Sequence, residues 1–229
     1  PYLTLFSRAG TSRAAADAAV AKLAIHELPA ARACTYVVPA DDFALALALA
    51  EAMGDQEMKV ALKLGVTERE IDKLCTAVLD AVDKTPRSPD EIRAATGDAS
   101  RSLGDAGKKK GMSSTLPIAL GRLQRAGELR RVPVNGRLDQ QRYSYVRWTP
   151  NPRKRFPIDA TQAYTALAGR FFRWAGPATV AEWQWYSGLG VKASAAILAP
   201  LGLVTAPGTS DRLLFPDDAE ALRTFKGPK

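Results

Sequence analysis

Histidine and cysteine are almost absent from this chain. Its 229 residues include one histidine, His26, and two cysteines, Cys34 and Cys75. A structural zinc site needs about four such ligands at close spacing, so we expect no metal and no other cofactor. We expect His26 at the end of a helix and not as a catalytic base. Both cysteines fit a reducing compartment, where we expect them to be small buried residues.

Long hydrophobic runs are missing too. A membrane-spanning helix needs roughly 20 apolar residues, whereas the longest candidate, Phe43–Ala50, is a short Ala/Leu run that predicts a buried helix. The sequence starts at Pro1 without the basic and apolar segments of a signal peptide. We therefore expect no membrane partner and a cytoplasmic location.

A phosphate-binding loop of the P-loop type is also excluded. The segment Gly104–Gly111 (GDAGKKKG) is rich in glycine and lysine, but it lacks four residues between its glycines and a following Lys-Ser or Lys-Thr. Its lysines are better suited to contact phosphates as point charges.

Positive charge, by contrast, is concentrated in one stretch. Between Arg101 and Arg155 there are 14 Lys or Arg residues and 3 Asp or Glu residues, an excess of 11, whereas the whole chain has a net charge of +8. The remainder is therefore mildly acidic. A localised basic surface is typical of proteins that bind a polyanion, DNA or RNA first. The alternative is a basic face kept for solubility.

Three helix starts are clear in the sequence. Thr67-x-x-Glu70, Ser88-x-x-Glu91 and Thr179-x-x-Glu182 each match the capping box, in which a hydroxyl and a carboxylate bind free amides at a helix N-terminus.

The elements follow one order twice. In the middle of the chain, the patterns predict helices over 71–82, 88–96 and 114–126, a strand over 128–134, a turn at Asn135-Gly136 and a strand over 143–148. Near the C-terminus they predict helices over 159–174, 179–187 and 192–201, then strands over 203–206 and 212–215. At the N-terminus a helix over 12–24 leads into an extended segment, with no helix expected before it.

Three helices closed by a two-stranded wing form a winged helix-turn-helix, whose third helix lies in the DNA major groove. We predict a mainly α fold with small β-hairpins (α+β). It would hold three tandem winged-helix units, the first incomplete: residues 1–66, a partial winged helix with a connecting helix; 67–155, the central basic unit; and 156–229, the C-terminal unit. Arg153–Arg155 is expected to be a linker. In the last unit, Trp183, Trp185 and Tyr186 cannot all face the core, so we expect Trp185 to be exposed or at an interface.

Three segments carry a family resemblance: 108–117 (KKKGMSSTLP), 127–143 (GELRRVPVNGRLDQQRY) and 176–189 (GPATVAEWQWYSGL). They resemble the bacterial tandem winged-helix family that includes the AlkZ- and YcaQ-type DNA glycosylases, which repair alkylated bases and interstrand crosslinks. The resemblance implies three winged helices around a basic concave surface that binds duplex DNA, alkylated or crosslinked, in association with the nucleoid.

The same resemblance implies a catalytic Gln-x-Gln or Gln-x-Asp motif, which this sequence lacks. None of its glutamines, Gln56, Gln124, Gln140, Gln141, Gln162 and Gln184, has Gln or Asp two positions later. The family motif would precede Tyr2–Ser7, so we expect either a fragment without it or a shortened relative. We name no catalytic residue and expect DNA binding without release of a base.

Two hypotheses follow: a glycosylase-like DNA-repair protein, or a winged-helix transcription regulator. Three units in one chain favour the first. For either, the predicted DNA-binding residues are Lys108, Lys109, Lys110, Ser113, Arg122, Arg125, Arg137, Gln140, Gln141 and Arg142.

Overall fold

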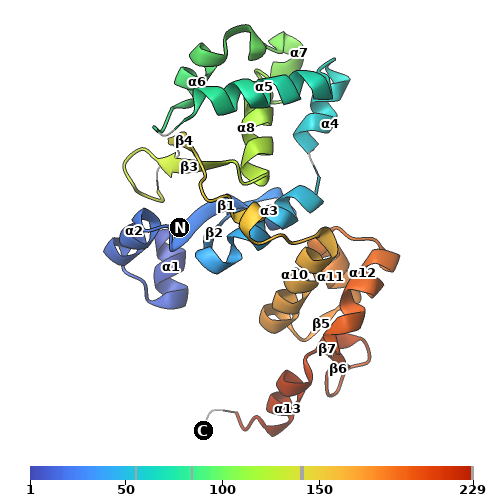
Figure 1. Cartoon of the computed structure of the whole chain (residues 1–229). Coiled ribbons are helices and arrows are strands. Elements are labelled where there is room, and N and C mark those ends of the chain that lie inside the picture. Colours follow the sequence, from blue (N-terminus) through green and yellow to red (C-terminus); the bar gives the residue numbers. More distant parts are fainter. Residues whose placement is uncertain (55, 84, 140–141, 228–229) are drawn as a thin grey trace. The chain divides into compact units, whose positions relative to one another are not determined.

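The computed structural model describes residues 1–54, 56–83, 85–139 and 142–227. The chain divides into two compact units, Pro1–Pro157 and Ile158–Lys229, and we describe each by itself. Both are mainly helical with small antiparallel sheets, as the sequence predicts (Figure 1). The first two expected domains share the first unit, and the three-part division remains a prediction.

The first unit begins with two helices and a hairpin and ends with a second hairpin and a short helix. Its elements are α1 (Tyr2–Ala9), α2 (Arg13–Ala21), β1 (Ile25–Pro29), β2 (Thr35–Pro39), α3 (Phe43–Ala52), α4 (Gln56–Lys63), α5 (Glu68–Ala81), α6 (Pro89–Thr96), α7 (Gly104–Lys108), α8 (Leu116–Arg125), β3 (Leu129–Pro133), β4 (Tyr143–Arg147) and α9 (Pro152–Arg155).

Helix α3 is the central helix of this unit. Every residue from Phe43 to Ala50 is buried, which confirms the prediction for that run. A helix that is apolar on all sides must be covered on all sides, and α3 packs against β1, α8 and α9. Figure 1 shows it beside β1 and below α8.

Helices α5, α6 and α8 enclose the main core, close to the predicted bounds. Ile71, Leu74 and Val78 on α5 are fully buried, and Leu120 and Leu123 on α8 are nearly so. Ser88 and Glu91 form a complete capping box on α6.

The third helix of this set is the one expected to read the major groove. Helix α8 packs against α5 on one side and α3 on the other, and Pro117 is its one exposed residue. Much of α8 is therefore covered within the unit, and its role as a groove-reading helix stays a prediction.

Two antiparallel hairpins complete the unit. In the first, His26 pairs with Val38 and Glu27 with Val37. In the second, Arg131 pairs with Tyr145 and Pro133 with Tyr143. Because side chains alternate along a strand, Arg131, Tyr143 and Tyr145 share one face of this hairpin. An isolated bridge between Arg87 and Tyr145 ties the start of α6 to β4.

The second unit repeats the order of helices and strands. It consists of α10 (Ala160–Ala175), β5 (Ala178–Thr179), α11 (Val180–Ser187), α12 (Val191–Leu198), β6 (Val204–Thr205), β7 (Arg212–Leu214) and α13 (Pro216–Thr224), and its sheet has the order β5-β7-β6. Trp183 is fully buried, whereas Trp185 is 71% exposed, which confirms the expectation for Trp185.

Four expectations prove wrong. A helix, α1, precedes the one predicted over 12–24. His26 lies in strand β1 and not at a helix end, and Cys34 is exposed, although Cys75 is buried as expected. The expected linker Arg153–Arg155 is the short helix α9, which is packed on α3 and capped by Asn151, whose side chain accepts hydrogen bonds from the amides of Arg153 and Lys154.

Candidate nucleic-acid interface

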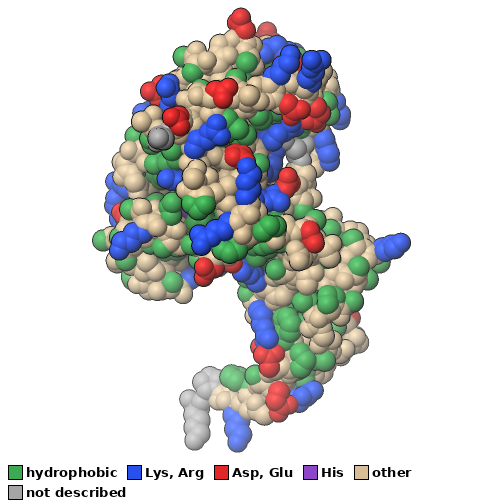
Figure 2. Space-filling view, viewed as in Figure 1, with side chains coloured by type: hydrophobic (Ala, Val, Ile, Leu, Met, Phe, Trp, Pro, Cys, Tyr) green, Lys and Arg blue, Asp and Glu red, His purple; other side chains and the backbone are tan. Residues whose placement is uncertain are grey.

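Many side chains of the basic segment already have partners within the first unit. Arg101 binds the Glu70 carboxylate, with 2.7 Å between Nε and Oε1. Arg122 binds Glu68 at 2.6 Å and Asp72 at 2.9 Å, and Arg153 binds Glu51. These carboxylates lie outside the basic segment, so the acidic remainder of the sequence neutralises part of its charge. Figure 2 shows blue and red side chains interspersed over this unit.

Arg147 is also used internally. Its guanidinium donates to the carbonyls of Leu79 and Val82 at the C-terminal end of α5, with the shortest distance 2.8 Å from Nη2 to the Leu79 oxygen. The last carbonyls of a helix have no intrahelical partner, so this arginine caps α5 and serves the fold.

The lysines predicted to bind DNA lie away from the β3–β4 hairpin. Lys108, Lys109 and Lys110 are exposed at the end of α7, with Lys108 3.4 Å from Asp105, and Ser113 is exposed just beyond them. Figure 1 shows α7 on the far side of α5 from the β3–β4 hairpin. The structure therefore does not gather all predicted residues into one patch.

Three predicted arginines have different surroundings. Arg122 is held between two carboxylates of α5. Arg125 lines a cavity together with Glu57. Arg137 pairs with Asp139 through both of its donor arms and thereby lowers the pKa of that carboxyl. A phosphate would have to compete with these carboxylates at Arg122 and Arg137.

The loop of the β3–β4 hairpin is anchored to the N-terminal helices. The Tyr2 hydroxyl donates to Asp17 and accepts from the backbone amide of Leu138 at 3.0 Å, and the Leu138 side chain is buried. The loop is thus docked on α1 and α2. The predicted Gln140 and Gln141 lie outside the described residues.

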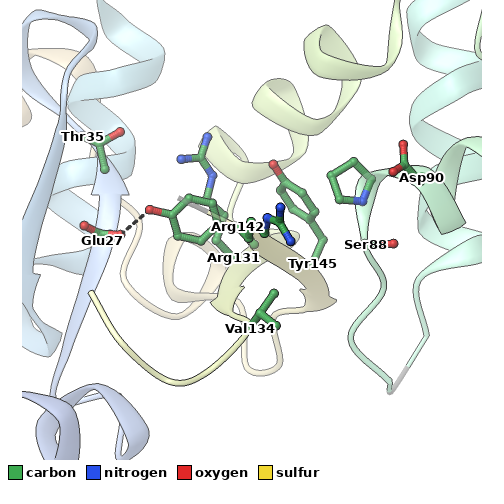
Figure 3. A pocket seen from close by; sticks show the side chains of 10 residues that line it. Glu27, Thr35, Ser88, Asp90, Arg131, Val134, Arg142 and Tyr145 are labelled. Carbon is green, nitrogen blue, oxygen red and sulfur yellow. Dashed lines mark hydrogen bonds between the residues drawn. The ribbon is translucent and has the colours of Figure 1, made fainter. Parts of the chain in front are cut away.

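Arg142 faces an open groove of about 970 Å³ between the two hairpins and the start of α6. In Figure 3, Glu27 and Thr35 lie on one side, Ser88 and Asp90 on the other, and Arg131, Arg142 and Tyr145 between them. We call this cavity the hairpin groove. It is lined by Glu27, Thr35, Ser88, Pro89, Asp90, Arg131, Val134, Arg142, Tyr143 and Tyr145.

Strand β4 holds both walls of the hairpin groove. On one side the Tyr143 hydroxyl donates to Oε2 of Glu27 at 3.0 Å, which joins β4 to β1 (Figure 3). On the other side the amide of Arg87 donates to the Tyr145 carbonyl at 2.9 Å, and the Tyr145 amide donates back at 2.7 Å. Because 116 positions separate Glu27 from Tyr143, only the tertiary fold forms this site.

The Tyr143–Glu27 contact has a defined protonation state near neutral pH. Burial, followed by the negative charge of Glu27 and the hydrogen bond to it, raises the pKa of Tyr143. The phenol therefore keeps its proton and donates a hydrogen bond to the carboxylate. The Arg131 guanidinium lies 5.2 Å from the centre of the Tyr143 ring, in cation–π contact.

A second cavity, of about 360 Å³, shares residues with the hairpin groove. Thr35, Pro89, Arg131 and Tyr145 line both, and the second extends along α8. The second cavity adds Arg93 and Arg125 to the basic residues of the hairpin groove. Together the two cavities are lined by acidic, basic and aromatic side chains.

Sequence reasoning missed Glu27, Tyr143 and Tyr145 as site residues. The alternation Tyr143-Ser144-Tyr145 places both rings on one face of a predicted strand, and this signal was available. For Glu27 the sequence holds no signal, because the partner hairpin is more than 100 positions away.

Within the part of the chain that the structure describes, no group of three or more His, Cys, Asp or Glu side chains could hold a metal ion. No helix among the described residues is long and apolar enough to cross a membrane.

Comparison with known families shows which family the chain belongs to. The family model described as "DNA glycosylase AlkZ-like" matches residues 1–229. The chain belongs to the AlkZ-like DNA glycosylase family.

The structure is similar to that of a member of this family. The DNA glycosylase AlkZ of Streptomyces sahachiroi superimposes with a TM-score of 0.65 and 17% identity, over 93% of this chain and 58% of AlkZ. At this identity the likeness shows the fold alone, and the chain spans less than two thirds of the length of AlkZ. A comparison with curated protein sequences finds no match.

Proposed function

We propose that this member of the AlkZ-like family is a DNA-repair protein that binds duplex DNA, alkylated or crosslinked, through the side of the first unit that carries the hairpin groove. The observation that carries the proposal is the hairpin groove, where Arg131 and Arg142 lie beside Tyr143 and Tyr145, with Arg93 in the adjoining second cavity. Arginines supply phosphate contacts and aromatic rings supply stacking for bases.

The architecture proposed is three tandem winged-helix units. The second unit supports this, because its helix–strand–helix–helix–strand–strand order and its β5-β7-β6 sheet are those of a winged helix. In the first unit, the Arg87–Tyr145 bridge occupies the place that β5 takes beside β7.

Weak sequence preference is part of the proposal. A regulator of transcription reads bases with an exposed helix in the major groove, whereas most of α8 is buried. Binding would therefore depend on the phosphate backbone and on DNA shape. This favours a repair role over the alternative of a winged-helix transcription regulator.

The salt dependence of binding tests the proposal. The log of the affinity for a duplex of about 20 base pairs should fall linearly with the log of salt concentration, and Arg142→Ala should reduce the slope by about one. Arg142 makes no ion pair among the described residues, so its loss should leave folding unchanged. Lys73→Ala is the matched control, because Lys73 is exposed on α5 and lines neither cavity.

Binding that is insensitive to salt, or no binding at about 50 mM salt, would overturn the proposal. An equal loss of slope in Lys73→Ala would show that the contact is a general charge effect and not the hairpin groove.

A further inference from the structure

The Glu27 carboxylate is the one acidic group of the hairpin groove that is fixed by a hydrogen bond from an aromatic residue among the described residues. We propose that the hairpin groove binds a single unpaired nucleotide and that Glu27 recognises its base through N–H donors. This inference rests on the proposed function, since it names what the DNA-binding face takes up.

The first argument is the chemistry of the carboxylate. An ionised carboxylate only accepts hydrogen bonds and has about four acceptor positions. Tyr143 occupies one of them, at 3.0 Å on Oε2. That bond orients the group and leaves the remaining positions open. A base that presents two adjacent N–H donors can satisfy both oxygens at once, and the Watson–Crick edge of guanine presents such a pair.

The second argument is that the nucleotide must be unpaired. In a duplex the Watson–Crick edge is occupied by the opposite base, and proteins that read it take the base out of the stack. The hairpin groove, at about 970 Å³, is in the size range of small-molecule sites, about 300–1,000 Å³. It can therefore hold one nucleotide together with water.

The third argument is the arrangement of charge and aromatic surface. Tyr143, which is partly exposed, offers ring surface next to the carboxylate, and base–aromatic stacking tolerates any base. Arg142 lines the same groove and is exposed, where a guanidinium can bind the phosphate of the nucleotide. The groove thus offers a carboxylate for the edge of the nucleobase, an aromatic ring for its face and a guanidinium for the phosphate.

The test uses the full chain and two duplexes that differ by one amino group. Each carries a single base opposite an abasic site, guanine in one and hypoxanthine in the other, and hypoxanthine lacks the 2-amino donor. Fluorescence anisotropy measures the Kd for each. We expect the guanine duplex to bind about tenfold or more tightly, since one hydrogen bond to a charged acceptor is lost with hypoxanthine.

Glu27→Gln should abolish this preference, so that the guanine and hypoxanthine duplexes bind with equal affinity. Tyr143→Phe, which keeps the ring and removes the hydroxyl that orients Glu27, should reduce it. Asp98→Asn is the matched control, because Asp98 is an exposed carboxylate outside the groove, and it should keep the full preference. If circular dichroism shows that Glu27→Gln does not fold, Tyr143→Phe carries the same test.

Equal affinity for guanine and hypoxanthine in the unchanged chain would overturn the inference, as would a preference that survives Glu27→Gln and Tyr143→Phe in folded protein. Either result with normal, salt-dependent binding to intact duplex leaves the proposed function in place. Loss of all duplex binding in the unchanged chain would instead refute the proposed function.

Discussion

The buried histidine makes the stability of this protein dependent on pH in a predictable way. His26 is 2% exposed, and its Nε2 has no hydrogen-bond partner among the described residues. Its ring packs edge-on against Phe43 and Trp148, with centroids 6.2 and 5.7 Å away. Burial, and then the positive charges of Arg130 and Arg131, lower its pKa from 6.5 to about 4.

The direction and the size of the change in stability with pH follow from the pKa of His26 in the unfolded and in the folded chain. The unfolded chain protonates His26 near pH 6.5, but the folded chain resists protonation until about pH 4. Below pH 6.5 the unfolded state therefore binds more protons, and the stability present above that pH is lost as the pH falls. Between pH 7 and pH 5 the free energy of unfolding should drop by about 2 kcal/mol, since one pKa unit corresponds to about 1.4 kcal/mol.

The composition leaves His26 as the main group that titrates between pH 5 and pH 7. His26 is the only histidine, and carboxyl groups with ordinary pKa values titrate mainly below pH 5. Urea unfolding of the first unit at pH 5, 6 and 7 gives the free energy at each pH. His26→Gln should remove the slope, whatever it does to stability at pH 7. The second unit has no histidine and is the internal control.

Two results would refute this reasoning. If the first unit were equally stable at pH 5 and pH 7, His26 would be protonated in the folded protein at no cost. If His26→Gln showed the same decrease, another group would be responsible.

Three further predictions follow from the packing and from the sequence. Leu123→Ala should destabilise the first unit by about 2–5 kcal/mol in urea unfolding, because a buried leucine on α8 is truncated; a change below about 1 kcal/mol would contradict the packing of α8. Tyr2→Phe should cost about 1 kcal/mol, because it removes the bonds to Asp17 and to the Leu138 amide; unchanged stability would show that the loop of the β3–β4 hairpin does not depend on that anchor. The chain should release no base above background from DNA with 7-methylguanine, measured as free base and abasic sites. Release would show that catalysis uses residues other than a Gln-x-Gln or Gln-x-Asp motif, and its loss in Glu27→Gln but not in Asp139→Asn would identify the hairpin groove.

Local patterns determined most of the secondary structure. The capping box at Ser88 and Glu91 forms as predicted, because both partners lie within one helical turn. At Thr67 only half of the box forms: the hydroxyl accepts from the Glu70 amide, but Arg101 takes the Glu70 carboxylate. The Ala/Leu run of α3 is buried because an apolar helix has no face to leave in water.

The tertiary structure alone decided which charges are available and where the site lies. The count of 14 basic residues between Arg101 and Arg155 suggested one basic face, but the fold places Glu70, Glu68, Asp72 and Glu51 against several of them. It also brings Glu27 to Tyr143 across 116 positions. Periodicity reports which side of an element is apolar. It does not predict which distant element will cover that side, because the contacts between elements depend on packing across the whole unit.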